Sequence, residues 1–267
     1  MKADDLKYIV KEKYGQIASQ SKIQNETSCC GATGSCSTVD YTIFSESYDK
    51  LKGYNAEADL GLGCGIPTQF ASIKEGDSVL DLGSGAGNDC FVARAIVGET
   101  GHVTGIDITE AMLEKAKRNA LKLGFINVEF VQGDIEEMPL PDNRFDVIVS
   151  NCVLNLVPDK DKAFSEMYRV LKPTGSFCVS DVVIKGDLPE KLRKDAEMYA
   201  GCVSGAIEMD EYLDIINKQG FKNVTVHKQK EISIPEEVLI NYLSIQEILN
   251  FKNGETGIFS ITVSAGK

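Results

Sequence analysis

Apolar runs of strand length recur along the middle of the chain and alternate with segments of helical periodicity. Five such runs cover residues 79–82, 102–107, 128–132, 145–150 and 176–183. Helical patterns separate them, notably over 110–123 and 160–171, and another helix begins near Asn88. Strands that alternate with helices of this length imply right-handed crossovers. The pattern therefore predicts an α/β fold with a doubly wound, mostly parallel sheet.

The segments before the first run differ from it in composition. Residues 1–20 alternate charged and apolar positions at helical spacing, which predicts a helix and neither a signal peptide nor a transmembrane span. Residues 19–40 are rich in Ser, Thr, Gly and Cys, so we expect a mobile segment that cannot pack on a core by itself. A short helix is expected over 43–55. Glycine is unfavourable inside helices and strands, so the glycine-rich stretch 60–65 predicts a loop.

The segments after the fifth run complete the expected organisation. Residues 186–206 exceed what a minimal sheet needs, and we expect this insertion to cap the edge of the active site. The remaining predicted elements are a helix over 210–219, strands over 223–229 and 258–265, and a helical stretch from Pro235. We therefore divide the chain into residues 1–40, an N-terminal helix with a mobile Ser/Cys-rich segment, and residues 41–267, one main domain.

Composition narrows the classes of partner. The chain carries 28 Lys and Arg against 40 Asp and Glu, a formal net charge of −12, which repels phosphate backbones and anionic lipid. We therefore expect neither nucleic acid nor membrane among its partners. With 267 residues, 43% of them hydrophobic, the chain can bury one complete core. Eight cysteines without an export signal indicate a reducing cytoplasm, where free thiols serve as ligands or redox groups more often than as disulfides.

A glycine-rich turn directly after the first predicted strand indicates a nucleotide-like cofactor. Its residues run Asp81, Leu82, Gly83, Ser84, Gly85, Ala86 and Gly87. Glycine lets the backbone turn sharply and lets a ligand approach closely, but nicotinamide and flavin enzymes use such a turn too. The discriminating residue is Asp81, because a carboxylate there would repel the pyrophosphate of a dinucleotide. S-Adenosylmethionine has no phosphate and carries a cationic ammonium and sulfonium, so we expect that cofactor.

Polar and apolar residues after the next strands extend this site. Asp107 is placed to accept hydrogen bonds from both ribose hydroxyls, and Met112 to lie against the adenine ring. A carboxylate or backbone acceptor around Asp134 would meet the adenine amine, with Ile135 on the ring. Each acid could instead be a solvated loop residue or a helix cap, but the carboxyl ends of four strands converge on one crevice. The expected cofactor-binding set is Asp81, Gly83, Ser84, Gly85, Gly87, Asp107, Ile108, Met112, Asp134, Ile135 and Asn151.

Three cysteine-containing blocks carry a family resemblance. They cover 57–65 (EADLGLGCG), 150–160 (SNCVLNLVPDK) and 199–206 (YAGCVSGA). With these blocks and the glycine turn, the sequence resembles the arsenite methyltransferases, in particular their compact microbial branch, over most of residues 54–221. The resemblance implies a class I methyltransferase, Rossmann-like fold and methyl transfer from S-adenosylmethionine to trivalent arsenic. Two departures are Lys-Pro-Thr-Gly at 172–175 in place of Pro-Gly-Gly, and a shorter C-terminal portion than in animal and algal relatives.

The resemblance also implies roles for individual cysteines. Cys64, Cys152 and Cys202 match the thiolates that bind arsenic, and Cys29 or Cys30 matches the N-terminal redox cysteine. Arsenite would arrive as a thiol adduct, and thioredoxin or glutathione would be the reductant. Soft thiolates suit a soft acceptor, and the arsenic lone pair needs no general base.

Other interpretations of the cysteines and histidines stay open at this point. Free cysteine is usually a small buried hydrophobic residue, which we expect for Cys90 and Cys178. A structural zinc site would want four ligands, commonly in closely paired spacing. We expect His102 and His227 to be structural. Rival functions are a methyltransferase for a small organic acceptor, with structural cysteines, and a thiol-based metalloid-binding protein without turnover.

Overall fold

The computed structural model describes residues 3–20, 46–186, 205–233, 236–240, 243–253 and 257–267. Several sequence predictions fall outside these ranges. They concern the Ser/Cys-rich segment with Cys29, Cys30 and Cys36, and Cys202 with nearly all of the cap insertion.

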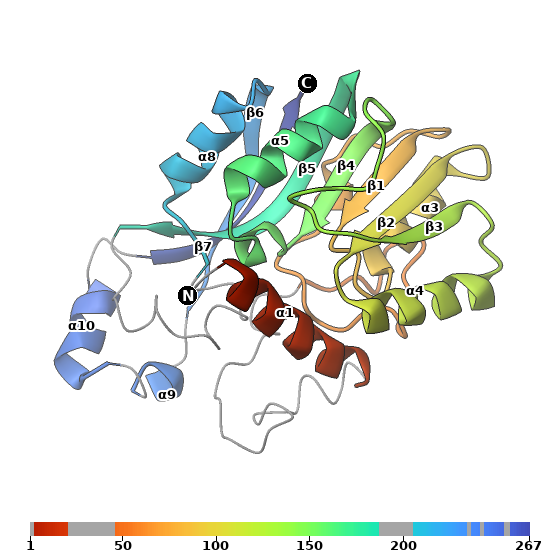
Figure 1. Ribbon diagram of the computed structural model, residues 1–267. Coiled ribbons are helices and arrows are strands. Elements are labelled where there is room, and N and C mark those ends of the chain that lie inside the picture. The colour runs from red at the N-terminus through yellow and green to blue at the C-terminus, as the bar shows by residue number, and fades with distance from the viewer. Residues whose placement is uncertain (1–2, 21–45, 187–204, 234–235, 241–242, 254–256) are drawn as a thin grey trace.

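The described residues form a seven-stranded sheet in the order β3-β2-β1-β4-β5-β7-β6 (Figure 1). The strands are β1 (Ser78–Leu82), β2 (His102–Asp107), β3 (Val128–Gln132), β4 (Phe145–Asn151), β5 (Leu171–Lys185), β6 (Lys222–Glu231) and β7 (Gly257–Gly266). The first five pair in parallel, whereas β7 runs antiparallel to both β5 and β6. The predicted mostly parallel, doubly wound sheet is therefore confirmed, with each predicted strand at its place in the chain.

Helices cover both faces of the sheet because consecutive strand residues point to opposite sides. Val79 packs with α3 and α4 on one face, and its neighbour Leu80 packs with α5 and α8 on the other. The helices are α1 (Ala3–Ala18), α3 (Asn88–Val97), α4 (Glu110–Leu123), α5 (Lys160–Val170), α8 (Met209–Lys218), α9 (Glu236–Leu239) and α10 (Ile245–Asn253), with 3-10 turns η2 (Pro67–Gln69) and η3 (Leu154–Leu156). In the parts of the chain that the structure describes, no helix has both the length and the apolar content to cross a bilayer.

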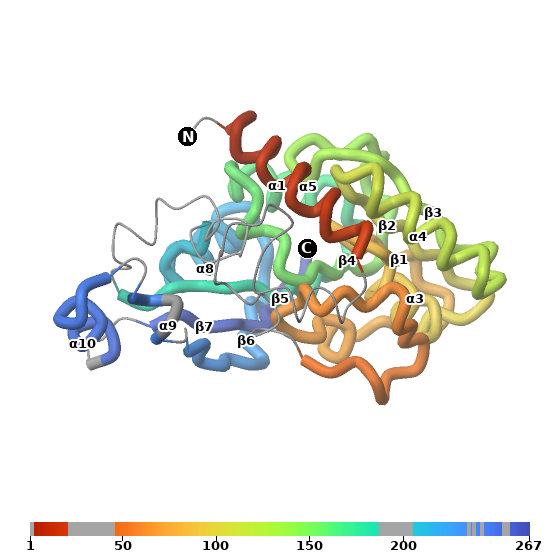
Figure 2. The backbone as a smooth tube through the Cα atoms, turned by 90° about the horizontal axis from the view of Figure 1, so that it is seen from below, coloured from red at the N-terminus to blue at the C-terminus, as the bar shows by residue number. Residues whose placement is uncertain are grey.

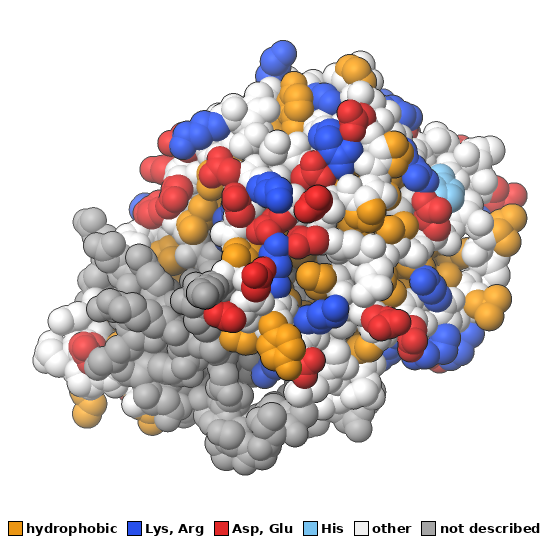
Figure 3. All heavy atoms as spheres, viewed as in Figure 1, with side chains coloured by type: hydrophobic (Ala, Val, Ile, Leu, Met, Phe, Trp, Pro, Cys, Tyr) orange, Lys and Arg blue, Asp and Glu red, His pale blue; other side chains and the backbone are white. Residues whose placement is uncertain are grey.

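The N-terminal helix α1 packs against α4 and η3 rather than standing apart (Figure 2). Lys7 forms ion pairs with Asp134, at 2.6 Å, and with Glu136. At the other end of the helix, Lys115 Nζ donates to the carbonyl of Ala18 at 3.1 Å. Helices α9 and α10 lie at the opposite end of the molecule from α3 and α4 in both views (Figure 1 and Figure 2). On the face shown in Figure 3, acidic and basic side chains are interspersed.

The prediction of a helix over 43–55 is wrong for residues 46–55, which form turns. Gly53 has φ +92°, a left-handed conformation that ends helical propagation, and a Cβ there would collide with the carbonyl of Phe91. Tyr48 is buried, and its hydroxyl donates to Asp89 at 2.9 Å. Tertiary contacts thus override a weak helical pattern at this point.

Candidate active site

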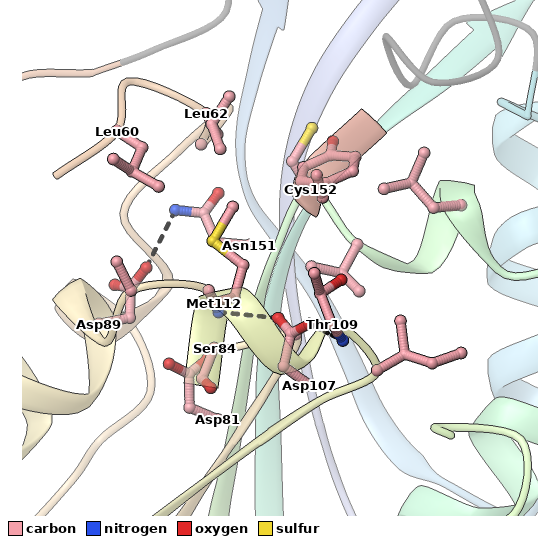
Figure 4. Close-up of a pocket in the computed structure, with 18 of the residues that line it drawn as sticks. Leu60, Leu62, Asp81, Ser84, Asp89, Asp107, Thr109, Met112, Asn151 and Cys152 are labelled. Atoms are coloured by element: carbon pink, nitrogen blue, oxygen red, sulfur yellow. Dashed lines mark hydrogen bonds between the residues drawn. The ribbon is translucent and has the colours of Figure 1, made fainter. Parts of the chain in front are cut away.

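A pocket opens at the carboxyl ends of β1, β2 and β4, where the strand order reverses between β1 and β4 (Figure 4). This switch point is where doubly wound sheets hold their ligands. All members of the expected cofactor set except Gly87 line it: Asp81, Gly83, Ser84, Gly85, Asp107, Ile108, Met112, Asp134, Ile135 and Asn151. The four polar groups expected to converge do so around this one pocket.

The glycine turn shapes the pocket through its backbone. Gly83, Gly85 and Gly87 all have positive φ, at +64°, +51° and +97°. A Cβ on Gly85 would meet no atom within 4 Å, so this glycine leaves open space at the pocket wall. Gly87 instead allows the ring of Phe91 to pack against the backbone, because a Cβ there would lie 2.8 Å from that ring.

Buried carboxylates make the pocket suited to a cation. Asp107 accepts the backbone N–H of Gly85 at 2.9 Å and that of Thr109 at 2.8 Å, so one of its oxygens is held by the glycine turn and the other by the residue before α4. Burial raises the pKa of Asp107. The pKa of Asp81 is raised further, first by burial and then by the charge of nearby Asp89. A positive ligand would relieve this repulsion, as the ammonium and sulfonium of S-adenosylmethionine can.

Two unpartnered polar atoms support the same fit. Among the described residues, the buried Ser84 hydroxyl and the Asn88 Oδ1 have no hydrogen-bond partner, and both residues line the pocket. Buried polar groups in proteins are normally paired, so a ligand or water has to satisfy them. The apolar side is formed by Met112 and Ile135, which are buried and flank the space expected for an aromatic base. The residues present therefore fit an adenosyl cofactor.

The Asp134 carboxylate is engaged within the protein. Its Oδ2 accepts from Lys7 at 2.6 Å, and its Oδ1 accepts the backbone N–H of Glu136 at 2.9 Å. Lys7 belongs to α1, whose Val10 and Tyr14 also line the pocket. The N-terminal helix thus forms one wall of the site, which the sequence did not reveal.

Two of the three expected arsenic ligands lie together. Cys152 lines the pocket and is 4% exposed, and Cys64 is completely buried in the same apolar cluster. Neither cysteine forms a disulfide, and the same holds for Cys90 and Cys178. Cys202 lies outside the described residues. In Figure 4, Cys152 is seen at the same pocket as Asp81 and Asp107.

A hydrogen-bond network joins the cysteine loop to the pocket, and two of its members were missed from the sequence. Asn151 Nδ2 donates to Tyr48 Oη at 2.7 Å, to the Gly65 carbonyl at 2.9 Å and to Asp89 at 3.2 Å. Burial raises the pKa of Asp89 to about 6. Asp89 follows the glycine turn so closely that its position at the start of α3 could have indicated a pocket residue. No pattern in the neighbouring sequence identifies Tyr48 as a pocket residue.

The remaining predicted residues have structural contacts. Cys90 and Cys178 are fully buried, as expected, but the Cys90 thiol also donates to Asp81 Oδ2 at 3.2 Å. His102 pairs with Glu129 at 3.3 Å, and His227 stacks on the ring of Phe70. Neither histidine lines the pocket.

Comparison with known proteins agrees with this geometry. Residues 73–220 match a family model described as "Methyltransferase domain". An arsenite methyltransferase from Halobacterium salinarum is 39% identical over 240 aligned positions, covering 85% of this chain and 60% of that protein. One from Aquipseudomonas alcaligenes is 34% identical over 241 positions, covering 88% of this chain and 67% of that protein.

A solved structure points the same way. The crystal structure of an arsenic(III) S-adenosylmethionine methyltransferase from Chlamydomonas reinhardtii matches with a TM-score of 0.64 and 39% identity, covering 77% of this chain and 67% of that one. The chain spans 60% of the length of the Halobacterium relative. The chain belongs to the methyltransferase domain family and, within that family, to the arsenite methyltransferases.

Proposed function

We propose that this chain transfers the methyl group of S-adenosylmethionine to trivalent arsenic held by cysteine thiolates. The observation that carries the proposal is that Cys152 lines the same pocket as Asp81 and Asp107, with Cys64 in the same apolar cluster as Cys152. Relatives named arsenite methyltransferases, similar over most of this chain, support the same activity.

The pocket residues bind and orient the cofactor. When bound, S-adenosylmethionine supplies an electrophilic methyl group on a sulfonium. Asp107 accepts hydrogen bonds from the ribose, and Met112 and Ile135 pack on the adenine. Asp81 and Asp89 stabilise positive charge, and the apolar walls exclude water from the reacting atoms.

The thiolates of Cys64, Cys152 and Cys202 hold arsenite after exchange from a thiol adduct. When bound, S-adenosylmethionine would supply its methyl group to the arsenic lone pair: the arsenic–carbon bond would form as the carbon–sulfur bond breaks, and the sulfur would leave as a neutral thioether. Because the lone pair is already a nucleophile, the chain provides alignment rather than a general base.

Methylation formally oxidises arsenic from the trivalent to the pentavalent state, so each turnover needs two electrons. A cysteine pair that includes Cys29 or Cys30 supplies them by forming a disulfide, which thioredoxin or glutathione then reduces by thiol exchange. A reducing cytoplasm is the compartment in which this cycle runs. A Cys29→Ser, Cys30→Ser double variant should complete an early turnover and then stall, and undiminished multiple turnover would remove this role.

The direct test incubates the purified protein with arsenite, glutathione and methyl-labelled S-adenosylmethionine, and separates the arsenic species. Wild-type protein should give labelled methylarsenicals. Cys64→Ser, Cys152→Ser and Cys202→Ser should each abolish the first transfer. Cys178→Ala removes a buried thiol that packs in a different apolar cluster and does not line the pocket, so it should retain the transfer.

Each alternative has its own outcome. Label on arsenic in the Cys152→Ser variant would disprove the ligand set. Cofactor binding without labelled arsenic would leave a methyltransferase for another acceptor. Arsenite binding with no cofactor binding in a titration would leave a metalloid-binding protein.

A further inference from the structure

Asn151 was expected to contact the cofactor, yet two of the hydrogen bonds of its side chain go to the loop that carries Cys64. Asn151 Oδ1 accepts the backbone N–H of Cys64 at 3.0 Å, and Nδ2 donates to the carbonyl of Gly65 at 2.9 Å. These two backbone groups belong to consecutive residues of the loop, Cys64 and Gly65. One side-chain amide therefore holds a segment 87 residues away in the sequence, at the residue that bears the thiol.

The fit of this segment against Asn151 requires glycine. A Cβ on Gly63 would lie 2.5 Å from Asn151 Nδ2, and a Cβ on Gly65 would lie 2.5 Å from Ser180 Oγ. The carbonyl of Cys64 accepts a hydrogen bond from Ser260 Oγ. The backbone of Cys64 is thus held on one side by the end of β4 and on the other by β7, in a space with no room for larger neighbours.

The residue after Asn151 is Cys152, the second thiol of the cluster. Cys152 has φ +60°, a left-handed conformation that costs energy in a residue other than glycine. Its N–H donates to the carbonyl of Ser180 at 2.7 Å, which holds this turn against β5. Two consecutive residues therefore position both sulfurs: Cys152 carries one sulfur, and Asn151 hydrogen-bonds to the backbone of Cys64, which carries the other.

Two further groups, from outside the Cys64 loop, also hold the side-chain amide of Asn151. Its Nδ2 lies 2.7 Å from Tyr48 Oη and 3.2 Å from Asp89 Oδ2. With donors and acceptor all engaged, rotation of the Asn151 side chain would break several hydrogen bonds at once, in a largely buried setting.

We propose that Asn151 is a positioning residue that sets the spacing of the Cys64 and Cys152 thiols and so prepares the arsenic site before substrate arrives. The inference rests on the proposed function, because it assumes that these thiols bind arsenic. Its contribution lies in preorganisation, since a thiol pair already in place loses less freedom on binding.

The test measures arsenite affinity of the cofactor-free protein by equilibrium dialysis with arsenic quantification, together with the sulfur-to-arsenic charge-transfer absorption. Asn151→Ala should weaken arsenite binding at least tenfold and reduce this absorption at saturation. Asn151→Asp, which keeps an acceptor for the Cys64 N–H, should weaken it less. The matched control is Asn155→Ala: Asn155 is buried on the same segment but donates to the carbonyl of Val182 at 2.7 Å, so affinity should stay within twofold.

The inference is overturned if Asn151→Ala, folded by circular dichroism, binds arsenite like the wild type, or if Asn155→Ala loses as much affinity. Should Asn151→Ala fail to fold, Asn151→Asp decides: wild-type affinity refutes the inference, and partial loss supports it. A wild-type protein that shows no sulfur-based arsenite binding would instead defeat the proposed function, and this inference with it. Methylation by the wild type combined with unchanged Asn151 variants would defeat the inference alone.

Discussion

Asp181 lies on β5 with its carboxylate buried, and it accepts a hydrogen bond from the hydroxyl of Tyr212 at 3.1 Å. Burial raises its pKa to about 7, and this shift is only partly opposed by Lys160 and the hydrogen bonds it accepts. Between pH 3.8 and 7 the folded protein keeps a proton on Asp181 that the unfolded chain has lost. The stability linked to this proton is complete below pH 3.8 and is lost as the pH rises to 7.

We therefore expect Asp181→Asn to gain stability relative to the wild type as the pH rises. The difference in unfolding free energy should move in favour of the variant by on the order of 4 kcal/mol between pH 4 and pH 8. Urea unfolding at both pH values measures it. A difference that does not change with pH would contradict the burial argument.

Cofactor affinity should depend on pH through the pocket acids. The pKa of Asp89 is raised to about 6 by burial, and that of Asp81 is raised as well. A cationic ligand binds the ionised carboxylates better, so the dissociation constant for S-adenosylmethionine should fall about tenfold from pH 5 to pH 7. Isothermal titration calorimetry in buffers of different ionisation enthalpy should also detect proton release. Asp89→Asn should flatten the profile, and a pH-independent wild type would count against the cation site.

At single positions, the sequence predicted types of environment better than particular contacts. Its expectation that Cys90 and Cys178 are buried is confirmed, because a small apolar side chain in a strand or helix facing the core has few alternatives. The hydrogen bond from the Cys90 thiol to Asp81 and the hydrogen bond from the Cys64 N–H to Asn151 were not predicted. Such contacts depend on the paths of loops in three dimensions, which no local pattern records.

Among the elements, α1 has the clearest consequence for ligand exchange. It supplies Lys7, Val10 and Tyr14 to the pocket, and the ion pairs of Lys7 with Asp134 and Glu136 fasten it. A bound cofactor would lie beneath this helix, so its departure should require α1 to loosen.

Lys7→Met should raise the dissociation rate of S-adenosylmethionine about fivefold, since losing a partly exposed ion pair costs about 1 kcal/mol. Stopped-flow displacement with excess unlabelled cofactor measures the rate. The matched control is Lys11→Met, because Lys11 is exposed on the same helix and does not line the pocket. Equal rates for Lys7→Met and wild type would show that α1 does not retain the ligand.

Elements with strong periodicity were predicted correctly, and the reason is physical. The central strands are buried on both faces, so each leaves a continuous apolar run. The expected helix over 43–55 lacked such a stripe, and Gly53 and Tyr48 took the chain into turns instead. The role of α1 as a pocket wall was also missed, because amphipathic spacing predicts a helix but not the surface on which it docks.

At the scale of the whole molecule, the sequence predicted the sheet class, and all of its expected cofactor residues except Gly87 line the pocket. Both follow from the rule that strand ends converge at a switch point. The division into residues 1–40 and 41–267 and the capping role of 186–206 stay predictions. The gathering of three sulfurs is the claim on which the account of function depends, and two of them, Cys64 and Cys152, already lie in one cluster.

X-ray absorption at the arsenic edge tests that claim most directly, with wild-type protein holding arsenite and S-adenosylhomocysteine. The account predicts arsenic bound to three sulfur atoms. It also predicts that Cys202→Ser lowers the count to two, and that Cys178→Ala leaves it at three. Arsenic bound mainly to oxygen, or a sulfur count unchanged by Cys64→Ser and Cys152→Ser, would contradict it.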